Sequence, residues 1–439
     1  MVAGNVPLMT TGIQEVVYRR PSALAGDGLT LETAGRHASY FTGFLTAARP
    51  AAMCLAILAD VAAADFRQDK IGTRGLRDPV VTCGGQRLRF EALSGCCGVY
   101  ARLDVLPAAL DGEVHARGTT NVDINPPLYT ALTQVGGGDP LRLTVGPDEL
   151  AVTTLDAHVV EKRVPLPERW LRGLAEAGFL AAGFDLRAEV PGGQAAALLH
   201  RLPAHRGDDR WLIPAGRSVR ATAAAAPGAV CLAGAHRLRL FRPLLPFTRT
   251  LRLYGPPVTA GSGPVAGGWE FDLGAIRFCV LLSPGVVRGL SGEGGLLPYL
   301  EEADALADRL GWGGTVDPVA LAAAGGLTGE QVRGALAALA TSGKVGYDWS
   351  EAGWFHRELP YRPDLLAALQ PRHVAARALV AAGEVRPAAG GYQVGTRLVH
   401  RAADGTWGCT CPWWTERYGR RGPCKHILAV SVLGAGGPA

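Results

Sequence analysis

The sequence predicts a multidomain α+β protein, and three patterns carry this prediction. Apolar residues recur at helical spacing near the start, short strand-like runs separated by Gly, Pro and Asp turns fill the middle, and three helices followed by a hairpin come later. We therefore divide the chain into a helical N-terminal segment (1–70), an antiparallel β-rich body of one or two α+β units (71–296), a winged-helix-like unit (297–362) and a C-terminal hairpin-plus-helix, or ββα, module (363–439).

Two runs in the N-terminal segment carry apolar side chains at intervals of three and four residues, which is typical of helices: 31–49 and 51–66. Arg49 precedes Pro50, and a residue before proline avoids the helical conformation, so we expect a break between two helices there. The second run contains Asp60 and is shorter than the roughly 20 apolar residues that span a bilayer. We interpret it as a buried helix.

The β-rich body is predicted from short apolar runs bounded by turn residues. The strand candidates are 80–82, 88–90, 141–145, 150–153, 238–240 and 278–282. Gly146-Pro147-Asp148 is expected to turn a hairpin between two of them. A helix is predicted over 167–177, where Pro167 suits a helix start, and a similar strand-to-helix rhythm recurs near 194–202. The Gly- and Pro-rich stretch 255–268 is expected to be a loop.

The winged-helix-like unit is predicted from helices over 300–310, 317–324 and 328–340, followed by a hairpin formed by 344–349 and 354–359. Thr328 and Gln331 have the spacing of a capping box at the third helix. In winged helices that read DNA this helix enters the major groove, but the unit carries nine acidic residues against four basic ones between Pro298 and Tyr361. Because such a surface repels phosphate, we favour a protein-contact or spacer role.

Near the end of the chain four residues have the identity and spacing of metal ligands: Cys409, Cys411, Cys424 and His426. Residues two apart on a strand point the same way, so Cys409 and Cys411 converge if 406–411 ends a hairpin arm. Cys424 follows Pro423 and is expected at the start of a helix that includes 427–433, with His426 in its first turn. Three thiolates and one imidazole suit one structural zinc ion with no open coordination position.

These residues resemble the SWIM-type zinc finger, whose signature is Cys-x-Cys, a spacer and Cys-x-His. The resemblance covers 392–433 and implies a ββα zinc module that binds nucleic acid or protein partners; it does not imply an enzyme. Two alternatives are incidental thiols in a small core and a three-Cys-one-His iron–sulfur cluster. The second alternative expects a wider spacing between the final Cys and His than the chain has.

Charge and aromatic residues gather in this region. From Pro371 onward nine basic residues face three acidic ones, while the rest of the chain is nearly neutral within a total of +5. Aromatic rings that stack bases and cations that hold phosphates would make the spacer, 412–423, a contact surface. Alternatively, the tryptophans fill the core of the module. The candidate contact residues are Trp413, Trp414, Arg417, Tyr418, Arg420, Arg421 and Lys425, and Trp407 accompanies them.

Motifs for phosphate loops, dinucleotide binding and nucleophile elbows are absent from the sequence, so we expect no enzyme, with residues 80–282 left open. The polar cluster 118–125 or the pair Cys96-Cys97 could line a pocket, but we favour a structural role for each. The first is typical of a turn network, and the second of small buried hydrophobes. His115 and His158 have no partner at a metal-ligand spacing.

The nine cysteines show no disulfide framework, and no secretory signal precedes them, which favours a reducing, cytoplasmic compartment. Lysine is rare while Ala, Gly and Arg abound, a bias that suggests a bacterial source. We predict a zinc-binding protein that binds DNA or RNA through its basic aromatic C-terminal module. The alternative is a protein–protein adaptor or scaffold subunit in which this module and the winged-helix-like unit dock other proteins. Neither role involves a membrane or a small-molecule substrate.

Overall fold

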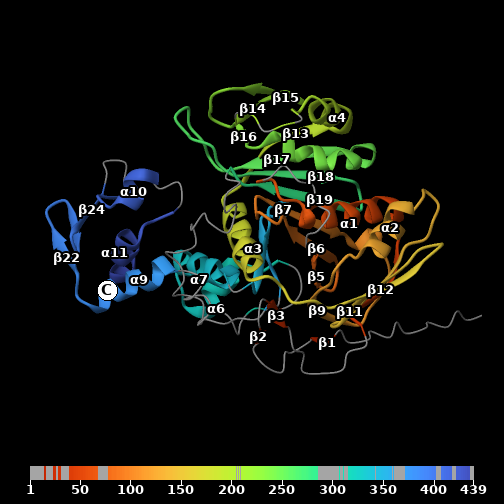
Figure 1. Cartoon of the computed structure of the whole chain (residues 1–439), viewed down its shortest axis with the longest axis horizontal. Coiled ribbons are helices and arrows are strands. Elements are labelled where there is room, and N and C mark those ends of the chain that lie inside the picture. Colours follow the sequence, from red (N-terminus) through yellow and green to blue (C-terminus); the bar gives the residue numbers. More distant parts are fainter. Residues whose placement is uncertain are drawn as a thin grey trace, which may run out of the picture.

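The computed structural model confirms a mixed, β-rich α+β architecture (Figure 1). The structure describes residues 14–15, 23–25, 28–30, 39–67, 78–203, 205, 207, 209–284, 306, 310, 315–341, 343–357, 359, 371–401, 407–417 and 422–435. The boundaries predicted above between the four regions remain predictions.

A nine-stranded sheet forms the centre of the body, and only its outermost pair, β1 with β9, is parallel. Its middle joins distant parts of the chain, because β7 pairs with β19 along seven residues. The order across the sheet is β1 (Gln14–Glu15), β9 (Ala116–Asn121), β5 (Val80–Cys83), β6 (Leu88–Leu93), β7 (Val99–Val105), β19 (Ile276–Leu282), β18 (Gly267–Asp272), β17 (Thr250–Gly255) and β13 (Asp185–Pro191). The loop between β17 and β18 is the one predicted over 255–268.

A second sheet has five antiparallel strands: β12 (His158–Lys162), β11 (Glu149–Thr153), β10 (Arg142–Val145), β4 (Phe41–Leu45) and β8 (Leu110–Val114). The predicted turn at 146–148 connects β10 and β11, as expected. A separate small hairpin pairs β2 (Ala23–Ala25) with β3 (Gly28–Thr30), and η1 (Pro107–Ala109) is a single 3-10 turn.

Strand β4 corrects the predicted helix over 31–49, of which 31–38 lie outside the described residues. Phe41, Gly43 and Leu45 face inward while Thr42 and Phe44 do not, which is the alternation of a strand. A Cβ on Gly43 would lie 2.5 Å from the Asp111 carbonyl oxygen, so glycine permits the close pairing with β8. The spacing of apolar residues was compatible with both a helix and a strand. Pairing with the distant strands β10 and β8 makes this segment a strand.

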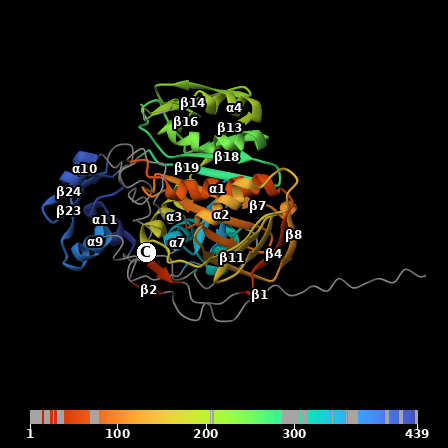
Figure 2. The ribbon, with the colours of Figure 1, turned by 45° about the vertical axis from the view of Figure 1, so that its right-hand side comes forward.

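Helix α1 (Ala48–Ala63) confirms the predicted buried helix, and apolar residues cover almost its whole surface. The predicted break at Arg49-Pro50 is wrong. Both residues lie in the first turn of α1, where proline is tolerated because its missing N–H has no partner within the helix. α1 packs on β6 and β7 and lies beside α2 (Pro126–Gln134) (Figure 2).

A smaller layer covers the far edge of the sheet, at the top of Figure 1. It contains α4 (Gly192–His200), which matches the rhythm predicted near 194–202, and a sheet of β14 (Arg210–Ala215), β15 (Ser218–Thr222) and β16 (Val230–Leu232). The strand predicted over 238–240 is wrong. Those residues belong to a 3-10 helix, η2 (Ala235–Phe247), whose two prolines are incompatible with a central strand.

Helix α3 (Glu168–Ala181) begins after Pro167, as predicted, and packs against α7 (Gly329–Thr341). The capping box holds, because the Thr328 N–H donates to Gln331 Oε1 at 2.8 Å and the Gln331 N–H to Thr328 Oγ1 at 3.2 Å. α6 (Pro318–Gly325) precedes α7. Most of the helix predicted over 300–310 lies outside the described residues, so the winged-helix architecture stays a prediction.

The predicted hairpin is present as β20 (Val345–Asp348) and β21 (Gly353–His356), and Asp348 and Trp349, where β20 ends, are buried against the nine-stranded sheet. Asp348 accepts hydrogen bonds from Arg102 at 2.8 Å and Arg277 at 3.0 Å. Trp349 packs against Tyr100 with a ring-centroid separation of 6.2 Å. Acidic residues of the winged-helix-like unit therefore have internal partners in the body.

The C-terminal module has its own hydrophobic core and stands to the left in Figure 1. It contains more than the predicted ββα unit: a four-stranded antiparallel sheet with three helices. The elements are α9 (Pro371–Ala381), β22 (Val385–Ala388), β23 (Gly391–Val394), β24 (Arg397–Arg401), β25 (Trp407–Cys409), α10 (Pro412–Arg417) and α11 (Lys425–Ala435). α11 packs on the sheet and α9 packs along α11, so the module has a helix beyond the one that was expected to accompany the hairpin.

Candidate metal centre

The four predicted ligands come together between β25 and α11. Val399 of β24 pairs with Cys409, which places the first thiol at the end of the sheet. The Thr410 N–H donates to the Leu398 carbonyl at 3.1 Å and so holds the step toward Cys411. The Cys424 carbonyl accepts the first hydrogen bond of α11, from Leu428 at 3.0 Å. A hairpin arm and a helix start therefore present the ligands, as the sequence predicts.

The geometry of the site fits one zinc ion. One ligand atom from each of the four residues can be chosen so that all lie within 4.8 Å of one another. His426 Nδ1 lies 3.7 Å from Cys409 Sγ and 3.9 Å from Cys424 Sγ. Atoms bound to zinc at about 2.0–2.3 Å in a tetrahedron stand about 3.3–3.8 Å apart. The site thus binds zinc through Cys409, Cys411, Cys424 and His426, with Nδ1 as the imidazole donor.

The thiols are buried and interact strongly. A hydrogen bond from Cys409 is the main cause that lowers the pKa of Cys424 to about 4, and the same bond raises the pKa of Cys409. Zinc binds thiolates, so the cluster holds one ligand in its binding form at neutral pH. With three cysteine ligands and one histidine the coordination sphere is closed, which makes the zinc structural.

The helix α9 contributes a residue that supports the centre. Arg372 Nη1 donates a 2.7 Å hydrogen bond to the carbonyl of Pro423, immediately before the ligand Cys424. Its guanidinium carbon lies 4.7 Å from the centroid of the Trp413 ring, and that of Arg417 lies 4.5 Å from the same centroid. Arg372 of α9 therefore contacts the spacer through a cation–π contact with Trp413.

The spacer begins as helix α10, which the sequence did not predict. The Cys411 carbonyl accepts hydrogen bonds from the N–H groups of Trp414 and Thr415, both at 3.0 Å, so the helix starts on a metal ligand. Trp413 and Trp414 are half-buried and pack against the module core. The alternative in which the tryptophans fill the core therefore describes part of their role.

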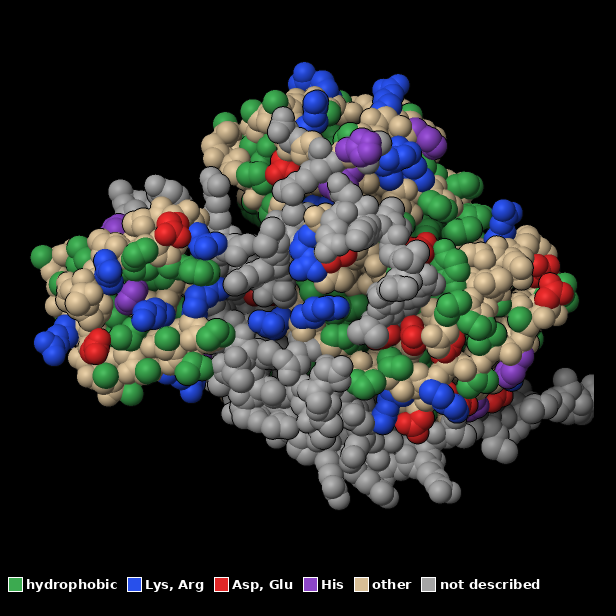
Figure 3. Space-filling view, in the orientation of Figure 1, with side chains coloured by type: hydrophobic (Ala, Val, Ile, Leu, Met, Phe, Trp, Pro, Cys, Tyr) green, Lys and Arg blue, Asp and Glu red, His purple; other side chains and the backbone are tan. Residues whose placement is uncertain are grey.

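The predicted contact residues are only partly described. Arg417 is half-buried and Lys425 is exposed, whereas Tyr418, Arg420 and Arg421 lie outside the described residues. Figure 3 shows Lys and Arg side chains spread over one face of the module. The assignment of all seven residues as contacts stays a prediction.

A cavity of about 460 Å³ opens beside the metal ligands. Arg372, Arg397 and Lys425 line it together with Trp413, and none of its described lining residues is acidic. Arg372 and Arg397 were not among the predicted site residues. The one sequence feature that could have indicated them was the excess of basic residues after Pro371. Arg372 lies on α9 and Arg397 on β24, outside the segment that holds the Cys and His ligands.

Side chains of the polar cluster 118–125, which was the less favoured pocket candidate, form hydrogen bonds inside the body. Asn125 Nδ2 donates to Glu161 Oε2 at 2.6 Å, and Thr120 Oγ1 donates to the Pro147 carbonyl at 2.9 Å. Cys96 and Cys97 are buried, consistent with small hydrophobes. These contacts favour the structural interpretation of both features.

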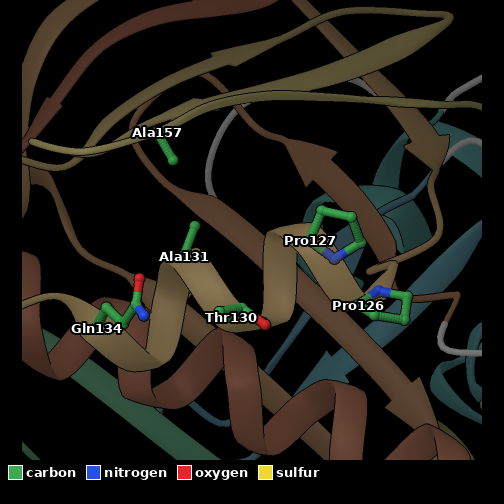
Figure 4. Close-up of a pocket in the computed structure, with 6 residues that line it drawn as sticks. All are labelled: Pro126, Pro127, Thr130, Ala131, Gln134 and Ala157. Carbon is green, nitrogen blue, oxygen red and sulfur yellow. The ribbon is translucent and has the colours of Figure 1, made fainter.

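A second hollow, of about 410 Å³, lies along α2 (Figure 4). Pro127, Ala131 and Gln134 are among its lining residues, and Ala157 faces them from the neighbouring loop. No titratable side chain is among the described residues that line it. The hollow therefore offers neither acid–base groups nor metal ligands.

The fold and the centre define a zinc-binding protein, and comparison with known proteins specifies the module. Residues 397–432 match the family model of the SWIM zinc finger, and the four ligands lie within that segment. The C-terminal module therefore contains a SWIM zinc finger. No protein with a curated description matches the chain.

Two solved structures align with part of the chain. The proliferating cellular nuclear antigen of Entamoeba histolytica has 11% identity and a TM-score of 0.37, and the alignment covers 56% of this chain and 99% of that one. The PCNA2–PCNA3 complex of Sulfolobus tokodaii has 8% identity and a TM-score of 0.38, with the same coverage. Similarity at this level leaves the function of the chain open.

Two further predictions can be compared with the structure. None of the nine cysteines, all of which lie in the described residues, is joined in a disulfide. Within the described ranges no helix combines the length and apolar character needed to cross a bilayer.

Proposed function

We propose that the chain binds nucleic acid, DNA or RNA, through the zinc-bearing C-terminal module. In this proposal it acts by binding and not by catalysis, and the zinc ion holds β25 and α11 in position. Phosphates of the nucleic acid are held by cations around the cavity beside the metal ligands. The proposal includes a bacterial, cytoplasmic setting, to which the sequence composition points.

The cavity is the observation that carries the proposal. Three cationic side chains converge there from α9, β24 and α11, in a space bounded by the metal ligands Cys411, Cys424 and His426. Arginine and lysine form charge-assisted hydrogen bonds with phosphate oxygens. The ligand set fixes β25 against α11, and β25 pairs with β24. Zinc therefore also fixes Arg397 of β24 relative to Lys425 of α11.

The distribution of charge supports the same site. The basic excess lies after Pro371, whereas Asp348 and Glu351 of the acidic unit pair with arginines of the body. A polyanion is therefore attracted to the module.

Charge reversal tests the proposal. Fluorescence anisotropy of labelled single-stranded and duplex oligonucleotides with the zinc-loaded full chain should show binding that Arg397→Glu combined with Lys425→Glu abolishes. A control variant with a charge reversed outside the cavity, Arg386→Glu on the exposed surface of β22, should retain most of the binding. The single variants Arg397→Glu and Lys425→Glu, which match its change in charge, should each weaken binding more than Arg386→Glu does. Absence of binding to every oligonucleotide at low salt would refute the proposal.

The adaptor hypothesis is the second candidate, since an acidic protein segment would suit the same cations. Isolation of the tagged chain with and without nuclease separates the two. A partner protein that is retained after nuclease treatment, and lost in the Arg397→Glu, Lys425→Glu variant, would favour the adaptor.

A further inference from the structure

We propose, resting on the function proposed above, that the cavity beside the zinc site takes the terminal phosphate of a single strand. The module would then bind strand ends in preference to continuous strands or duplex. The inference rests on the shape of the cavity, on its charge and on the contacts of Trp413.

Shape favours a single strand. A duplex is a convex object, and proteins read it by placing a helix or a pair of strands into its grooves. Here Arg372, Arg397 and Lys425 line a hollow of about 460 Å³, which falls within the usual range of small-ligand pockets. The flexible end of an unpaired strand can adapt its backbone to such a hollow more readily than a stiff duplex can.

Charge favours a terminal phosphate over an internal one. A phosphomonoester carries a charge of about −1.5 to −2 at neutral pH, and an internal diester carries only one negative charge. A terminal phosphate also offers three oxygens without a second ester link. Three cations without an acidic neighbour in the cavity lining match the larger charge and the larger number of acceptors.

One cation is already held in place. The hydrogen bond from Arg372 to the Pro423 carbonyl and its contact with the Trp413 ring fix the guanidinium before any ligand arrives. A pre-oriented arginine loses less conformational entropy on binding than a free one.

The contacts of Trp413 weigh against base stacking in the cavity. The guanidinium carbons of Arg372 and Arg417 both lie within 4.7 Å of its ring centroid, so cations occupy the space over the ring. Recognition there would depend on charge and not on the base. Binding at the cavity should therefore show little dependence on the identity of the terminal nucleotide.

Four labelled probes of one sequence test the inference with the zinc-loaded full chain: a single strand with a 5′-phosphate, one with a 3′-phosphate, one with hydroxyl groups at both ends, and a covalently closed circle. We expect at least one phosphate-ended strand to bind about tenfold more tightly than the hydroxyl-ended strand and the circle. Arg397→Gln and Lys425→Gln should each remove most of this preference. Arg386→Gln, which removes the same charge outside the cavity, should preserve it.

The outcomes separate this inference from the proposed function. If the circle binds as tightly as the phosphate-ended strands, the end-specific inference is wrong and nucleic-acid binding stands. If none of the probes binds, both are wrong. Competition by inorganic phosphate at concentrations that leave the circle bound would support a phosphate subsite. Binding of a phosphopeptide but of no oligonucleotide would assign the cavity to a protein partner and overturn the inference.

Discussion

Arg372 donates a 2.7 Å hydrogen bond to the carbonyl oxygen of Pro423, the residue immediately before the zinc ligand Cys424. Arg372 belongs to α9, which lies before the segment that matches the SWIM zinc finger. The bond therefore connects an additional helix to the metal centre. The same guanidinium also lines the cavity. Arg372 therefore supports the zinc site and supplies a cation to the cavity.

Substitution of Arg372 should weaken the hold on zinc. Arg372→Ala removes the bond to Pro423 and the contact with Trp413, so the start of α11 is less well fixed. We expect zinc affinity to fall by about tenfold, the lower end of the effect of residues that support metal ligands. Competition with a chromophoric chelator measures this. Arg386→Ala serves as the control, and equal zinc retention in both variants would contradict a supporting role for Arg372.

Loss of a ligand should unfold the module. Cys424→Ser replaces a thiolate with a poor zinc ligand, and the folding of small metal sites is coupled to binding worth on the order of 10 kcal/mol. We expect zinc to be lost and residues 392–433 to become sensitive to protease. Elemental mass spectrometry and limited proteolysis check both effects.

The control for this variant is Cys231→Ser, a buried cysteine of β16 that should leave the zinc content unchanged. Full zinc retention by Cys424→Ser would refute the ligand assignment. Visible absorbance from bound iron in the wild-type chain would instead favour the iron–sulfur alternative.

The buried carboxylate of Asp348, at the end of β20, should be essential for stability. Asp348→Asn leaves Arg102 and Arg277 with one fewer buried carboxylate, and removal of one partner from a buried ion pair costs about 3–5 kcal/mol. Urea unfolding followed by fluorescence measures the loss. Glu351→Gln, at a position one-third exposed and paired with Arg87, should cost less than about 1 kcal/mol. Equal effects of the two substitutions would contradict the account of this contact.

The same carboxylate predicts a dependence on pH. Burial opposes the ionisation of Asp348, but the charges of Arg102, Arg277 and Arg89 outweigh it and hold its pKa well below the usual range. A carboxyl group with a lowered folded-state pKa stabilises the protein above its unfolded pKa of about 3.9 and loses that contribution as the pH falls further. The stability difference between wild type and Asp348→Asn should thus be constant from pH 7 to about 5 and shrink below about 4.

This difference is largely insensitive to zinc release in acid, because both proteins lose zinc together. Urea midpoints measured for the two proteins at each pH provide the test. A difference that grows on acidification would have the wrong sign for an ionised, paired Asp348.

The metal centre could be predicted because its information is local. Ligand identity, the alternation of a strand and the proline before Cys424 are all read within a short stretch, and β25 and α11 confirm them. The buried helix α1 was likewise evident, because apolar residues around its whole circumference indicate burial.

Other features depend on contacts between distant residues. The apolar spacing near Phe41 suited a helix, but pairing with β10 and β8 makes it a strand. Arg372 and Arg397 reach the cavity from separate elements, and no spacing rule connects them to Cys424. The burial of Asp348 against Arg102, 246 residues away in sequence, could not be foreseen from an acidic composition.

The salt dependence of oligonucleotide binding by the intact, zinc-loaded chain tests the central claim most directly. If the cations of the module hold phosphates, the logarithm of the binding constant should fall linearly with the logarithm of the salt concentration. Each phosphate that is neutralised on a single strand contributes about −0.7 to the slope, so the slope should be about −0.7 or steeper. No binding at low salt, or binding with a slope near zero, would contradict the claim that this module binds nucleic acid.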